Sequence, residues 1–200
     1  MNFALGATLF ADAIPGLRSA KDGNTGHAKL HMELLASRLM GPKEVRIHHF
    51  LRPWILSLVF AHLGVDVRLM FLYADAVLQV ELPSQELATQ SLMALADVYV
   101  KSRKIFLPMP LKTALVYAKD HDAEKARSVY EGNDHSSGEV DDMSLERIYP
   151  NFDLLTRDLN TLDVWIQTYE PFWTWYASQP KPKRYQEMEL DWAKLQVSAL

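Results

Sequence analysis

Four carboxylate side chains are the residues of this sequence that could hold a catalytic metal ion. Asp75 precedes a predicted strand that ends at Glu81, and Asp141 and Asp142 adjoin each other in a polar segment. A magnesium-dependent nuclease needs converging carboxylates, usually with a lysine nearby to stabilise developing charge or orient water. Glu81 occupies the place where that lysine would help, and half-buried strands routinely expose such side chains. We therefore expect no catalytic residue, and a minimal magnesium-dependent nuclease built on these carboxylates is the alternative.

The histidines and the nucleophile patterns predict neither a metal site nor a cofactor. His27 and His31 are four residues apart but belong to no HExxH pattern, and the adjacent His48 and His49 must point apart. The sequence has no cysteine, which excludes thiol catalysis, and no GxSxG, GxxxxGKS/T or GxGxxG pattern. The sequence therefore lacks the motifs that characterise an ATPase or a dehydrogenase.

Two clusters of basic side chains are the candidates for contact with DNA. They are Lys101, Arg103 and Lys104, at the end of a predicted helix, and Lys181, Lys183 and Arg184, in the tail PKPKR. Lysine and arginine supply the phosphate contacts that dominate affinity for nucleic acid. Such charges also suit a helix C-terminus through the helix dipole, so a solvated surface remains the other interpretation of each cluster.

Aromatic side chains are dense between residues 165 and 176. Some of them continue a four–three helical repeat and are predicted to face the core: Tyr169, Trp173 and Tyr176. The three that fall off that face are Trp165, Phe172 and Trp175. Because exposed aromatic side chains are common at protein interfaces, we expect these three to contact a partner protein. Stacking on single-stranded bases is disfavoured, because no lysine or arginine lies among them.

Length and composition exclude several classes of protein. The 200 residues fit one domain, with or without an appendage, and 48% of them are hydrophobic, which rules out wholesale disorder. No apolar run approaches the roughly 18–20 residues that cross a bilayer, and the first ten residues carry no basic side chain to begin a signal peptide. The absence of cysteine suits the cytoplasm. The net charge of −4 counts against a free-standing nucleic-acid-binding protein.

The elements that must position these residues are predicted from periodicity and turn signals. Helices are expected over about 28–40, 51–63, 84–104, 112–119, 123–130 and 152–176, and strands over 65–71 and 77–82, paired as a hairpin. Residues 1–27 are expected to have little regular structure, 132–142 to form a surface loop, and 179–200 to form a basic linker with a short helix. The predicted class is α/β, with a small mixed sheet flanked by helices and a helical C-terminal half.

The order of several segments carries a resemblance to a known family. These segments are RIHHFLRPWILSLVFAHLG (46–64), the strand pair, the helix bearing Leu92, Leu95 and Tyr99, LPMPLKTALVYAK (107–119), KARSVYEGNDHSSGEVDD (125–142) and ERIYP (146–150). In this order they resemble the C-terminal domain of RecC, the gamma subunit of exodeoxyribonuclease V. The resemblance spans about residues 46–178, which predicts a poorly matched segment over 1–45 and a separate tail over 179–200.

The resemblance implies a fold and a function that the residues alone do not indicate. It implies a degenerate PD-(D/E)xK nuclease fold without the catalytic carboxylates and lysine. It also implies a non-catalytic subunit, or a fragment of one, in a RecBCD-like helicase–nuclease that processes DNA ends for repair by recombination. The expected partners are the other subunits and, within the complex, DNA, to which the chain would contribute protein interfaces and part of a channel. A protein-interaction module unrelated to DNA is the further alternative.

Overall fold

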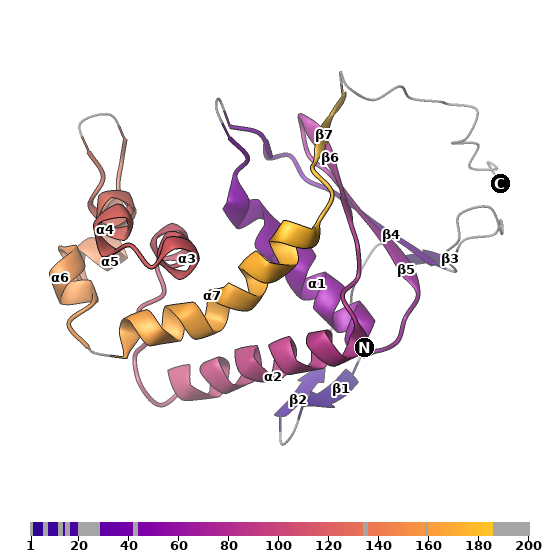
Figure 1. Cartoon of the computed structure of the whole chain (residues 1–200), viewed down its shortest axis with the longest axis horizontal. Helices are drawn as coiled ribbons and strands as arrows, with labels where there is room; N and C mark the ends of the chain where they lie inside the picture. Colours follow the sequence, from indigo (N-terminus) through magenta and orange to yellow (C-terminus); the bar gives the residue numbers. More distant parts are fainter. Residues whose placement is uncertain are drawn as a thin grey trace. The chain divides into compact units, whose positions relative to one another are not determined.

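The protein forms two compact units. The structure is a computed structural model that describes residues 2–5, 8–11, 14, 17–19, 29–41, 44–133, 136–158 and 160–185. The helical unit is built from residues 1–14, 47–65 and 82–179. The sheet unit is built from residues 15–46, 66–81 and 180–200. The chain thus enters the sheet unit three times, and Figure 1 shows the elements of both units.

The sheet unit contains a mixed sheet of five strands in the order β3-β4-β5-β6-β7. The strands are β3 (Leu17–Ser19), β4 (Lys29–Leu34), β5 (Val67–Leu72), β6 (Ala76–Val80) and β7 (Lys183–Arg184). All neighbours pair antiparallel except β4 and β5, which pair in parallel. Along β5, Val67, Leu69 and Phe71 are buried, and the residues between them are half-buried. This alternation and the β5–β6 pairing confirm the predicted hairpin.

The helix predicted over residues 28–40 is wrong, because Lys29–Leu34 form β4. Leu30 and Leu34 have helical spacing, but Leu34 is 80% exposed, so their spacing marks no buried face. The side chain of this strand that is buried is His31, which is 1% exposed. The strand pairs with β5 along its whole length, which satisfies its backbone groups through a partner almost 40 residues away in sequence. The periodicity of a short sequence segment cannot predict this pairing of β4 with the distant β5.

The helical unit contains a short antiparallel hairpin and nine helical segments in the described part of the chain. The hairpin consists of β1 (Asn2–Leu5) and β2 (Thr8–Ala11). The helical segments are η1 (Ile47–Phe50), α1 (Leu51–His62), α2 (Gln85–Ser102), α3 (Leu111–Asp120), α4 (Ala123–Glu131), η2 (Glu139–Asp141), α5 (Met143–Ile148), α6 (Phe152–Leu155) and α7 (Thr161–Ser178). Figure 1 shows α3 to α6 gathered at one end of this unit. Every helix in the described ranges is too short or too polar to cross a lipid bilayer.

Local signals explain most of these helices. Ser84 accepts a hydrogen bond from the backbone N–H of Leu87 and so caps α2. Asp122 does the same for α4, and Gly64 follows α1 with φ of 62°, a conformation that glycine adopts at little cost. The α/β class, the small mixed sheet and the helical C-terminal half are therefore confirmed.

Other expectations for the chain ends are corrected or lie outside the described residues. Residues 1–27 were expected to have little regular structure, but β1, β2 and β3 occupy much of their described part. The short helix predicted near the C-terminus falls on residues 186–200, outside the described residues.

The aromatic segment forms two helices in place of the single helix predicted over 152–176. Asn151 caps α6 through a hydrogen bond from the backbone N–H of Leu154, and the chain leaves the helical path before α7 begins at Thr161. The side chains predicted to be exposed are buried: Trp165 (0% exposed), Phe172 (0%) and Trp175 (3%). That exposure, on which the predicted partner interface rested, is therefore wrong.

Most of the buried stripe of α7 is offset by one residue from the predicted one. Of the three rings predicted to face the core, Tyr169 is buried, whereas Trp173 and Tyr176 are half-buried. The residues 165, 168, 172 and 175 repeat at three and four positions, just as the predicted 166, 169, 173 and 176 do, so spacing alone cannot select between them. The contacts of the rings decide the orientation. Phe172 packs edge-on against Trp54 of α1 with ring centroids 5.5 Å apart, and the Trp173 Nε1–H donates to the Leu115 carbonyl of α3 over 2.8 Å.

Candidate nucleic-acid interface

The first basic cluster lies where α2 ends. The backbone N–H groups of Lys104 and Ile105 both donate to the carbonyl of Lys101, at 2.9 and 3.1 Å, and this closes the last turn of the helix. Pro108 and Pro110 then keep the following segment from continuing as a helix. The side chains of Lys101, Arg103 and Lys104 are all exposed. We call this cluster the basic turn.

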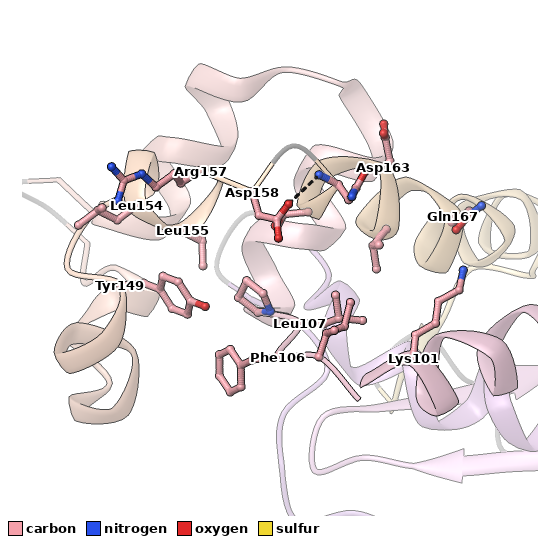
Figure 2. A pocket seen from close by; sticks show the side chains of 15 residues that line it. Lys101, Phe106, Leu107, Tyr149, Leu154, Leu155, Arg157, Asp158, Asp163 and Gln167 are labelled. Atoms are coloured by element: carbon pink, nitrogen blue, oxygen red, sulfur yellow. Dashed lines mark hydrogen bonds between the residues drawn. The ribbon is translucent and has the colours of Figure 1, made fainter. Parts of the chain in front are cut away.

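A groove of about 690 Å³ begins at the basic turn and lies wholly within the helical unit. One side is formed by Lys101 and the segment that follows it, and the other by Tyr149, α6 and the first turns of α7. Figure 2 shows Lys101 at one end of the groove and the rings of Phe106 and Tyr149 close together at the other. A hollow of this size falls in the range of small-ligand sites.

The aromatic end of the groove is held by contacts to the core. Phe106 and Tyr149 stack with ring centroids 6.0 Å apart and an interplanar angle of 21°. The Tyr149 carbonyl accepts a hydrogen bond of 2.7 Å from the Tyr130 hydroxyl. Beneath the groove, the buried Nε1–H of Trp165 donates to the Pro108 carbonyl at 2.8 Å. Phe106 is nevertheless 68% exposed, so a large apolar ring faces solvent.

The cations of the basic turn differ from the basic residues of α4. In α4, Arg127 binds Asp153 at 2.6 Å, and Lys125 forms an ion pair with Asp120. These contacts lower the pKa of both aspartates, because the hydrogen bond to the cation favours the charged carboxylate. Within the described ranges, the three cations of the basic turn have no ion pair with a carboxylate. Their charge is thus available to an anion.

Acidic side chains line the opposite wall. Asp158 precedes α7, accepts a hydrogen bond of 3.4 Å from the backbone N–H of Asn160, and is exposed. Asp163 lies in the first turn of α7, and Arg157 stands beside Asp158 in the chain. Figure 2 shows both aspartates along this wall, away from the two stacked rings. The groove therefore has a basic side and a mixed, partly acidic side.

The second basic cluster belongs to the sheet unit. Lys183 and Arg184 form β7, which pairs with β6 at the edge of the sheet, and Lys181 precedes it. The Tyr185 hydroxyl donates to the Tyr73 carbonyl at 2.7 Å and fastens this segment to the β5–β6 turn. All three basic side chains of the cluster are exposed.

The carboxylates that could form a nuclease site either lie far from one another or accept hydrogen bonds from backbone N–H groups. Asp75 accepts hydrogen bonds from the backbone N–H groups of Leu39 (2.8 Å) and Met40 (3.2 Å). Glu81 follows the far end of β6, so strand geometry places it roughly 20 Å from Asp75. That distance is far beyond the reach of one shared metal ion. Asp142 caps α5 by accepting from the Ser144 backbone N–H at 2.9 Å. In the part of the chain that the structure describes, no three histidine or acidic side chains cluster as metal ligands.

The segment KARSVYEGNDHSSGEVDD forms part of the scaffold. The Glu139 carboxylate accepts hydrogen bonds from the backbone N–H groups of Lys112 (2.9 Å) and Thr113 (2.7 Å) at the start of α3. Glu131 accepts from the Phe152 backbone N–H at 2.8 Å, at the start of α6. Gly132 has φ of 76°, and a Cβ on Gly138 would lie 2.3 Å from the Tyr130 carbonyl oxygen. Glu131, Gly132, Gly138 and Glu139 thus have structural roles.

Of the residues predicted to contact DNA, the structure places Lys101 in the groove, with Arg103 and Lys104 in the adjoining turn. Phe106 and Tyr149 also line the groove, but they are not among the residues predicted from the sequence to contact DNA. An apolar Ile-Phe pair between basic residues and a proline-rich segment is a signal that could have indicated Phe106. Tyr149 meets Phe106 only through the fold, because 42 residues separate them in the chain.

Comparisons with known proteins identify the family. The RecC C-terminal domain matches residues 2–122, which is 121 of the 200 residues. This match includes residues 2–45, which the resemblance did not reach, and ends before the KARSVYEGN segment that contributed to it. A search of curated proteins finds no match. Because the family match covers more than half of the chain, the protein belongs to the RecC C-terminal domain family, whose members are linked to DNA processing by multi-subunit RecBCD-type complexes.

Proposed function

We propose that this chain is a non-catalytic RecC-like subunit, or a fragment of one, in a complex that processes DNA ends for repair by recombination in the cytoplasm. The observation that carries the proposal is the family match over residues 2–122. The proposed partners are the helicase and nuclease subunits of such a complex and the DNA that it processes. The proposed fold relationship is to nucleases of the PD-(D/E)xK type, with the chemistry lost.

The position of Asp75 supports the absence of nuclease chemistry. A carboxylate at a strand end could serve as a metal ligand, but here both oxygens accept backbone N–H groups of the segment at Leu39 and Met40. Its candidate partner in the predicted hairpin, Glu81, follows the other end of β6. The minimal nuclease that would use these two carboxylates together therefore has no geometric support.

The basic turn supports contact with DNA within the complex. Its three exposed cations have no described ion-pair partner and stand beside an open groove. Lysines and arginines in this state gain the most from phosphate, because no internal ion pair must be broken. The cluster at Lys181, Lys183 and Arg184 is the second proposed point of contact. Trp165, Phe172 and Trp175 are not proposed as an interface, because they are buried.

The test of this function combines assembly and activity. The chain is co-expressed with the other two subunits of a RecBCD-type complex, and we expect all three to co-purify. The purified chain alone, with Mg²⁺ and linear DNA, is expected to leave the DNA intact. Failure to bind either subunit would contradict the proposal. So would metal-dependent cleavage that is lost in Asp75→Ala or Glu81→Ala.

A further inference from the structure

The groove beside the basic turn combines the parts of a single-stranded nucleic-acid site. We propose that it binds single-stranded DNA, with a base stacked on Phe106 and the phosphates against Lys101, Arg103 and Lys104. The inference rests on the proposed function, because it names the form of DNA that this component contacts and the place of contact. It assigns to the Phe106–Tyr149 pair a role that the core does not require.

The aromatic geometry supplies the stacking surface. Phe106 contacts Tyr149 at 6.0 Å but stays 68% exposed, so much of the ring remains open to a ligand. Burying an exposed phenylalanine in the core would be favourable. Two residues after Phe106, the Pro108 carbonyl accepts the hydrogen bond from Trp165, which ties this part of the segment to the core. Tyr149 is fixed in turn by the Tyr130 hydroxyl. A base that enters the groove thus meets a ring that is already stacked on Tyr149, whose own backbone is tied to the core.

The charges determine how the strand would lie. The three cations stand within six residues of the chain that ends in Phe106, so phosphate contacts and base stacking can be made by neighbouring nucleotides. Asp158 and Asp163 on the opposite wall repel phosphates, and Arg157 beside Asp158 offsets only one of these two charges. The sugar–phosphate backbone is therefore expected along the side of the basic turn, with bases directed toward Phe106. Because every base has a π-face, binding should show little sequence preference.

The observations favour a nucleic acid over a peptide. Apolar side chains at the groove, including Ile105 and Leu154, could also accept a hydrophobic peptide. Such a peptide would leave three exposed, unpaired cations unused at the edge of its own site. A polyanion with flat apolar rings matches both the charge and the aromatic surface.

The first experiment tests whether a base stacks on the ring of Phe106. Fluorescence anisotropy measures binding of the full chain to a labelled oligothymidine and to an abasic oligonucleotide of equal length and charge. One stacked base predicts that the wild-type chain binds oligothymidine about 5- to 150-fold more tightly than the abasic strand. Phe106→Ala and Phe106→Leu should lose most of this ratio, whereas Tyr99→Ala, a change at an exposed aromatic residue of α2 outside the groove, should keep it.

The second experiment tests the phosphate contacts. The triple variant Lys101→Ala, Arg103→Ala and Lys104→Ala should weaken binding to both oligonucleotides and reduce the slope of log K against log salt by about 2. The matched control removes three exposed basic side chains of the helical unit that do not line the groove, at Lys112, Lys119 and Arg147. It should change the slope less. Circular dichroism confirms that each variant is folded.

The outcomes separate this inference from the proposed function. Equal binding of the two oligonucleotides, or an unchanged ratio in both Phe106 variants, overturns the stacking site even if the chain assembles with its partner subunits. Loss of subunit co-purification in Phe106→Ala, with the ratio unchanged, also overturns it and identifies the groove as a protein interface. Ring-dependent binding of single strands by a chain that assembles with no subunit would support the site while the proposed function fails.

Discussion

Glu131 and Glu139 have the same role at two different helices. Each carboxylate accepts backbone N–H groups at the start of a helix to which it does not belong: Glu139 at α3 and Glu131 at α6. The first N–H groups of a helix have no partner within it and carry a partial positive charge. Pro110, at the cap position of α3, provides no side-chain acceptor, so Glu139 replaces one.

Glu139→Ala should lower the free energy of unfolding by about 1–2 kcal/mol, the usual effect of losing a cap. Urea denaturation followed by circular dichroism measures the change. Glu146→Ala is the control, because Glu146 is exposed on α5, and its effect should stay within about 0.5 kcal/mol. Equal effects of the two substitutions would show that the cap does not stabilise α3.

Gly138→Ala should be more costly than an ordinary glycine replacement. Its Cβ would lie 2.3 Å from the Tyr130 carbonyl oxygen and 2.7 Å from the Gly132 backbone nitrogen, so backbone must move. We expect a loss of about 3 kcal/mol in urea denaturation. Gly64→Ala serves for comparison, because its Cβ meets nothing closer than 3.9 Å and only the positive φ is unfavourable, at about 1 kcal/mol. A smaller loss at Gly138 than at Gly64 would contradict the steric argument.

At the scale of elements, α7 shows why the pattern of a helix can be read one residue out of phase. Its sequence supports two stripes with the same spacing, and only the neighbouring helices α1 and α3 select between them.

Phe172→Ala should therefore cost about 3–5 kcal/mol in the free energy of unfolding. Met143→Ala, at an exposed position of α5, should change it by less than about 0.5 kcal/mol. Similar values in urea denaturation would mean that Phe172 faces solvent, as its position off the predicted stripe suggested.

Elements defined by local signals could be predicted, and elements defined by distant partners could not. The β5–β6 hairpin and α2 follow from alternation, a turn and a Ser84 cap, all present within a few residues. The strand β4 depends on parallel pairing with β5, and no local feature marks it. The same division applies to the candidate interface. The basic turn can be read from adjacent residues, but the Phe106–Tyr149 pair exists only after the helices pack.

For the whole molecule, a net charge of −4 does not describe where charge is available. Arg127 lies beside Asp153, Glu131 and Glu124, and these neighbours raise its pKa, mainly through the hydrogen bond that Arg127 donates to Asp153. The basic turn has no such neighbours in the described part of the chain. An overall acidic protein can therefore offer a local site for an anion.

The stability of the whole molecule should decline at alkaline pH through two tyrosines. Burial is the main cause that raises the pKa of both Tyr130 and Tyr169 to about 12, from an ordinary value of 10.0. Because the folded state holds the protons more tightly, their contribution to stability is complete below pH 10 and is lost as the pH rises toward 12. Urea denaturation between pH 9 and 12 measures this. The Tyr130→Phe/Tyr169→Phe double variant should lose less stability over that range, and an unchanged decline would contradict the assignment.

The carboxylate of Glu139 lies outside the residues that the family match covers, and the helix that it caps lies inside them. A fragment cut at residue 122 would keep α3 but lose the acceptor for its first N–H groups. It would also lose Trp165 and Trp173, whose indole N–H groups bond to the Pro108 and Leu115 carbonyls. The span recognised as the family therefore leaves out side chains that bond to the backbone inside it. An expression boundary should be placed after β7, at or beyond Tyr185, and not at the end of the family match.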